Sequence, residues 1–166
     1  MTSRRLVLCL AATLWVSGCR MSDGPFPAED RELPNRIDDL NRDLGNIAAG
    51  HVEAKQDFTD DLLVFVNLEA KPDAKPAVEE LARQVAEAIP KAPLAEDRGR
   101  QLCRQMWLTV ASREFSDKQL ETLRGNVQSA LVGVGVGEPR ARGIAAQVGE
   151  VQKQVTYRSR RWYELY

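Results

Sequence analysis

Apolar side chains recur every three or four residues along most of this chain, which is the spacing of one face of an α-helix. The first stripe begins after Pro34 and runs through two glycines without a change of phase. Its members are Ile37, Leu40, Leu44, Ile47, His51, Ala54, Phe58, Leu62 and Phe65. The pattern predicts one long helix over 34–69, bent near Gly50. Because glycine costs about 1 kcal/mol relative to alanine inside a helix, two helices with a break there remain an alternative.

Two further stripes predict the next helices. Pro76 suits a first helical turn, and Pro90 and Pro93 end the helix that follows it. A third helix is expected from about residue 95 to residue 113. The inward-facing positions of the two helices are Val78, Leu81, Val85 and Ile89, then Leu102, Cys103, Met106, Trp107 and Val110.

The sharpest start signal lies in the sequence SDKQL. Ser116 followed three residues later by Gln119 is a capping box, so a helix begins here and is expected to end at Gly133. The following GVGVGEP resembles a phosphate-binding loop only superficially, because it follows a helix and lacks the G-x-G-x-x-G spacing. We interpret it as a helix C-cap and a flexible connector. Pro139 starts a last helix, whose buried face is Ile144, Val148, Val151, Val155 and Trp162.

No segment alternates convincingly as a strand. The sequence therefore predicts an all-α fold, a bundle of about five mostly antiparallel helices over 34–166.

The N-terminus has the pattern of an export signal. Arg4 and Arg5 precede an uncharged run of 11 residues from Leu6 to Val16. That run is shorter than the roughly 20 apolar residues that span a bilayer as a helix. A basic start, a short apolar run and small residues before a cleavage point are typical of a secretory signal peptide.

The sequence Val16-Ser17-Gly18-Cys19 resembles the lipobox of bacterial lipoproteins. The resemblance covers about the first 20 residues, and Val16 replaces the more common leucine. It implies cleavage after Gly18, acylation of Cys19 and anchoring in a membrane, because lipid chains contribute about 0.8 kcal/mol per buried CH₂. Arg20 stands where an aspartate retains enteric lipoproteins in the inner membrane, which implies the outer membrane. The alternative is an ordinary secreted protein cut near this point.

These signals divide the chain into a signal peptide, residues 1–18, a lipidated tether, residues 19–33, and the helical domain. Loss of residues 1–18 removes two arginines and no acid, so the net charge changes from −1 to −3. A strongly basic face is typical of nucleic-acid binding, and this charge argues against such a partner.

Cysteine usage limits the covalent chemistry. Cys9 leaves with the signal peptide and Cys19 carries lipid, so Cys103 has no partner for an intramolecular disulfide. We expect Cys103 to be a buried small apolar residue, with a reactive thiol as the alternative.

The single histidine and a row of four acidic residues are the polar features that could suggest a metal site. His51, the single histidine, has no metal-ligating neighbour one turn away and is expected to be a polar residue on the buried stripe. Glu53, Asp57, Asp60 and Asp61 form a row that could attract a divalent ion, but a solvated acidic face explains them as well. The sequence thus predicts no metal, no cofactor and no catalytic residue.

The C-terminal sequence VTYRSRRWYELY is the strongest binding candidate. It contains Arg158, Arg160, Arg161, Trp162 and Tyr163, and these residue types are enriched at binding hot spots. The alternative is that Trp162 and a tyrosine or two pack on the bundle while the arginines remain solvated.

The sequence as a whole predicts a lipid-anchored, periplasm-facing protein of the outer membrane that binds an envelope protein without catalysing a reaction. A helical carrier or sensor of an apolar ligand is the alternative.

Overall fold

A computed structural model of the chain describes residues 33–64, 66, 74–111 and 115–155, and every regular element among them is an α-helix. The C-terminal residues Arg158 to Tyr163 and the N-terminal Cys19 lie outside the described residues. The helices are α1 (Leu33–Ala49), α2 (Ala54–Val64), α3 (Ala74–Ala88), α4 (Glu96–Val110), α5 (Asp117–Gly133), α6 (Glu138–Ala146) and α7 (Val148–Val155). The predicted all-α class is confirmed.

The prediction of one helix over 34–69 is wrong, because α1 ends at Ala49 and α2 begins at Ala54. Gly50 has a φ of +95°, a left-handed conformation that residues with a Cβ rarely adopt. The N–H of His51 then donates to the carbonyl of Asn46 at 3.0 Å, which closes the end of α1. The break lets α2 fold back against α1 and bury Phe58 and Leu62, which a single straight helix would leave without a partner.

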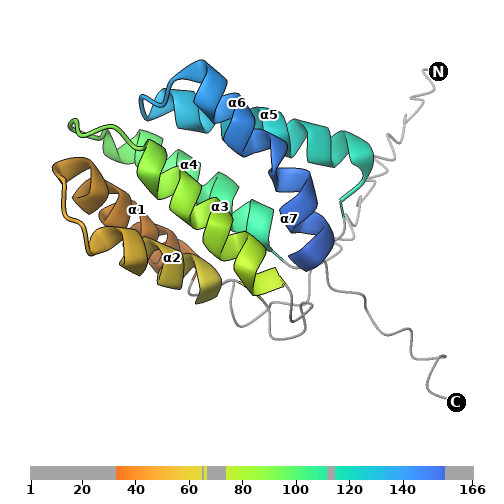
Figure 1. Ribbon diagram of the computed structural model, residues 1–166, viewed down its shortest axis with the longest axis horizontal. Coiled ribbons are helices and arrows are strands. Elements are labelled where there is room, and N and C mark those ends of the chain that lie inside the picture. Colours follow the sequence, from red (N-terminus) through yellow and green to blue (C-terminus); the bar gives the residue numbers. More distant parts are fainter. Residues whose placement is uncertain (1–32, 65, 67–73, 112–114, 156–166) are drawn as a thin grey trace, which may run out of the picture.

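The last predicted helix is also interrupted. α6 ends at Ala146, and the N–H of Gln147 donates to the carbonyl of Ile144 at 3.0 Å, a tighter turn than that of an α-helix. α7 then starts at Val148 in a new direction (Figure 1). The predicted inward face is correct up to Val155, and Trp162 lies outside the described residues. These two interruptions explain why seven described helices replace the expected five.

Both ends of α5 were predicted correctly. The Ser116 side chain accepts a hydrogen bond from the backbone N–H of Gln119, whose own side chain accepts from the backbone N–H of Ser116. The helix ends at Gly133, and Gly135 turns the chain with a φ of +92°. The GVGVGEP sequence is therefore a helix end and connector, as expected.

The helices pack mainly on their neighbours in sequence (Figure 1). α1 pairs with α2, α2 with α3, α4 with α5, and α5 with α6, while α1 also packs on α4 and α7 on α3, α4 and α5. Leu40, Leu44, Leu81, Leu102 and Met106 are fully buried in the shared core. This arrangement places the N-terminal half of α1 beside the outer face of α4.

Candidate binding groove between α1 and α4

α1 and α4 run antiparallel and approach closely at Gly99. A Cβ built on Gly99 would collide with the Asn41 side chain, so glycine permits this approach. One turn nearer the start of α1, the Arg100 guanidinium lies 3.1 Å from the Asp38 carboxylate and 3.1 Å from that of Glu96. The Gly99–Asn41 approach and the Arg100–Asp38 ion pair show which residues of the two helices face each other.

Beyond this contact an open groove of about 630 Å³ lies between the two helices. The apolar part of its wall is Leu33, Pro34, Ile37 and Trp107, and the polar part is Asp38, Asp97, Arg100, Gln101, Arg104 and Gln105. The groove therefore combines an apolar end, where α1 begins, with a row of charged and amide side chains along α4.

Several polar groups of this wall lack partners in the described part of the chain. The side-chain oxygen of Gln105 is buried there without a hydrogen-bond donor. Arg104 is exposed and makes no ion pair with the described residues, unlike Arg100. Arg104 is therefore the group of this wall with which an acidic side chain of a ligand could pair.

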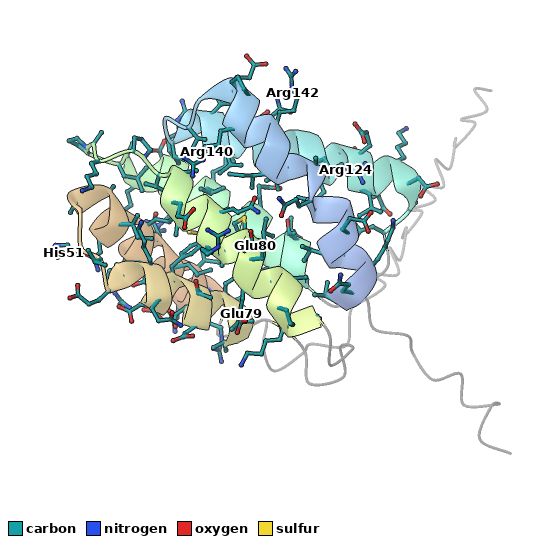
Figure 2. All side chains as sticks on the ribbon, viewed as in Figure 1. His51, Glu79, Glu80, Arg124, Arg140 and Arg142 are labelled. Atoms are coloured by element: carbon teal, nitrogen blue, oxygen red, sulfur yellow. The ribbon has the colours of Figure 1, made fainter. Side chains whose placement is uncertain are left out.

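A second hollow of about 370 Å³ lies between α2 and α3, and two of its charged side chains, Arg83 and Glu87, already pair with each other. The Arg83 side chain donates to Glu80 at 2.6 Å and to Glu87 at 2.6 Å on its own helix. Hydrogen bonds from Arg83 and Gln84 hold the pKa of Glu80 well below its usual range. The exposed face of α3 that carries Glu79 and Glu80 is visible in Figure 2. Of these two hollows, the α1–α4 groove is the better candidate for ligand binding.

A buried acid that the sequence-based predictions did not include, Asp43, lies further along α1 than the groove. Asp43 on α1 is 4% exposed, and burial together with the neighbouring carboxylate of Asp61 on α2 raises the pKa of Asp43 to about 6. Asp57 acts in the same direction and Arg42 opposes it. A protonated Asp43 can donate to Asp61, which accounts for the hydrogen bond between them. The signal was present in the sequence, because Asp43 lies one turn from both Leu40 and Ile47 on the buried stripe.

Cys103 lies on the α4 side of this acid. Its side chain is fully buried and its thiol is free, as predicted. Burial, with the charge of Asp43 as the next contribution, raises the pKa of the thiol far above its usual range. Because the thiolate is the nucleophile, both burial and the raised pKa disfavour reaction at Cys103 in the folded protein.

The remaining polar predictions can now be placed. His51 is exposed at the tip of the α1–α2 hairpin (Figure 2), so the expectation of a residue on the buried stripe is wrong. Glu53, Asp57 and Asp60 are exposed, as expected for a solvated face, whereas Asp61 turns toward Asp43. No group of three or more His, Cys, Asp or Glu residues in the described ranges is arranged to hold a metal ion.

Comparisons of the chain with protein-family models, with curated proteins and with solved structures find no match. None of the described helices has the length and apolar character needed to cross a bilayer.

Proposed function

We propose that this protein is a lipid-anchored, periplasm-facing factor of the outer membrane that binds an envelope protein and catalyses no reaction. The observation that carries the proposal is the sequence Val16-Ser17-Gly18-Cys19, placed directly after a short apolar run with a basic start. Acylation of Cys19 would hold the helical domain at the membrane surface, because two or three lipid chains bind a bilayer stably.

The geometry of the domain supports binding over carriage of an apolar ligand. A carrier needs a largely apolar chamber that covers most of its ligand. The hollows beside α4 and α3 are instead open to solvent and bordered by charged side chains. An open groove of this kind suits a segment of polypeptide.

The C-terminal residues Arg158, Arg160, Arg161, Trp162 and Tyr163 are the proposed contact with the partner. Their support is chemical: arginine and large aromatics combine apolar area with directed hydrogen bonds, the combination found at interface hot spots.

Replacement of Cys19 by alanine is expected to release the protein from the membrane fraction into the soluble periplasmic fraction, because no other acylation point follows the proposed signal. Cell fractionation followed by immunoblotting measures the distribution. Cys103→Ala is the matched control and should leave the protein in the membrane fraction. Membrane association that survives Cys19→Ala would contradict the anchor.

Replacement of Arg160, Arg161 and Trp162 by serine is expected to abolish crosslinked co-purification of the envelope partner. The control is the double variant Arg140→Ser, Arg142→Ser, which removes two exposed arginines from α6 (Figure 2). Thermal unfolding of the purified variants separates the two interpretations of the segment. A preserved melting temperature with a lost partner supports a binding surface, whereas a collapse of stability would show that the segment packs on the bundle.

A further inference from the structure

We propose that the groove between α1 and α4 is the docking site of the chain's own residues 24–32, GPFPAEDRE, with Phe26 on the apolar end formed by Leu33, Ile37 and Trp107. These nine residues lie outside the described part of the chain and lead directly into Leu33, which itself lines the groove. The proposed occupant, residues 24–32, is thus covalently attached to a residue of the groove wall.

The length of the segment fits the groove. α4 presents the wall from Asp97 to Trp107, ten residue steps that extend over about 15 Å of helix. Seven residue steps separate Phe26 from Leu33, and an extended chain of that length reaches about 24 Å at most. Phe26 can therefore reach any part of the wall by folding back along α1.

The chemistry of the segment is complementary to the groove. Phe26 is the one large apolar side chain between Gly24 and Glu32, and it matches the apolar end of the groove. Glu29, Asp30 and Glu32 outnumber the single Arg31, so the segment is acidic and can pair with the exposed Arg104 near the apolar end, away from Asp97 at the other end of the α4 wall. Pro25 and Pro27 favour an extended backbone, which suits a segment that lies along a groove.

The covalent connection to Leu33 favours residues 24–32 over a separate molecule as the occupant of the groove. A short linker holds its end at a millimolar effective concentration, so a segment with only millimolar intrinsic affinity is docked about half of the time or more. A second copy of the chain or a free partner must bind from solution without this advantage.

Docking would shorten the tether. If Cys19 carries the lipid proposed above, the fourteen residue steps from Cys19 to Leu33 give the domain a reach of about 48 Å. With Phe26 docked, seven steps remain free and the reach falls to about 24 Å. The groove would then set the distance between the domain and the membrane.

Trp107 in the groove wall reports directly on occupancy. The test uses the mature chain, residues 19–166, with Cys19→Ser to remove the lipid and Trp162→Phe so that Trp107 is its single tryptophan. In this background we compare Phe26→Ser with Met21→Ser, an apolar-to-polar change in the tether outside the docking segment. With the segment docked half of the time or more, Phe26→Ser should raise the acrylamide quenching constant of Trp107 by about two-fold or more, and Met21→Ser should leave it unchanged.

The result that would overturn the proposal is equal quenching of Trp107 in all three proteins, which would mean that the groove is open to a partner. Protection that grows with protein concentration would also overturn it, because the occupant would then be a second copy. A disulfide provides an independent measurement: Phe26→Cys with Gln105→Cys, two residues from Trp107 in the groove wall, should oxidise to an intramolecular bond, and Phe26→Cys with Ser129→Cys on the exposed face of α5 should not. Because the anchor is absent from these proteins, failure here is distinguishable from failure of the proposed function.

Discussion

Replacing Gln152 by leucine is expected to lower the free energy of unfolding by about 2–3 kcal/mol, because buried carbonyls would lose their donor. The Gln152 side chain is 2% exposed, and its amide nitrogen lies 2.9 Å from the carbonyl oxygen of Thr109 and 3.0 Å from that of Ala111. The carbonyl oxygen of Leu108 is 3.3 Å away. One amide from α7 thus satisfies the C-terminal end of α4.

The size of this effect follows from the way α4 ends. The last carbonyls of any helix lack intrahelical donors, and α4 has no basic residue in its final turn to replace them. Leucine has nearly the volume of glutamine but no N–H, so the change removes the hydrogen bonds while preserving the packing.

Urea unfolding followed by circular dichroism measures this loss. Gln154→Leu is the matched control on the same helix, since its half-buried side chain makes no hydrogen bond within the described residues, and its stability should change by less than about 0.5 kcal/mol. If Gln152→Leu and Gln154→Leu prove equally stable, the cap on α4 contributes nothing.

Replacing Asp43 by asparagine is expected to stabilise the protein by about 3 kcal/mol at pH 7 and by less than about 1 kcal/mol at pH 4. The folded state raises the pKa of Asp43 from 3.8 to about 6 through burial and the nearby Asp61. The folded protein therefore binds this proton more tightly than the unfolded chain does. The contribution of Asp43 to the free energy of unfolding is largest below pH 4 and decreases as the pH rises toward 6. Above the folded-state pKa it no longer changes with pH.

The measurement is the difference in unfolding free energy between Asp43→Asn and the native protein from pH 4 to pH 8. Asparagine keeps the shape of the protonated acid and can still donate to Asp61. Asp60→Asn, an exposed change on α2, is the control and should give a small difference that does not grow over this range. If the difference in unfolding free energy between Asp43→Asn and the native protein does not change with pH, ionisation of Asp43 does not destabilise the folded protein.

The elements predicted correctly are those determined by neighbouring residues. The capping box at Ser116 and Gln119 is complete within four residues, and the buried stripe around Leu102 and Met106 repeats within one helix. Cys103 was assigned to the core for the same reason. Local chemistry was therefore enough to predict the helical class, the ends of α5 and most of the core.

The errors occurred where tertiary packing outweighs local periodicity. The stripe through Gly50 keeps its phase, yet folding α2 back on α1 buries more apolar surface than continuing the helix, and His51 becomes an exposed hairpin tip. Asp43 and Gln152 were overlooked because their partners are on other helices. The groove depends likewise on how α1 meets α4, which are separated in the sequence by α2 and α3.

The cap from Gln152 has a consequence for the order in which the bundle assembles. The pairs α1–α2, α2–α3, α4–α5 and α5–α6 join helices that follow one another, so each requires only a short loop to close. Gln152 instead meets Thr109 across 43 residues of sequence. The carbonyl groups at the end of α4 therefore gain their hydrogen-bond donor only when α7 packs against α4. During synthesis from the N-terminus, these carbonyl groups would remain hydrated until α7, the last described helix, has been made.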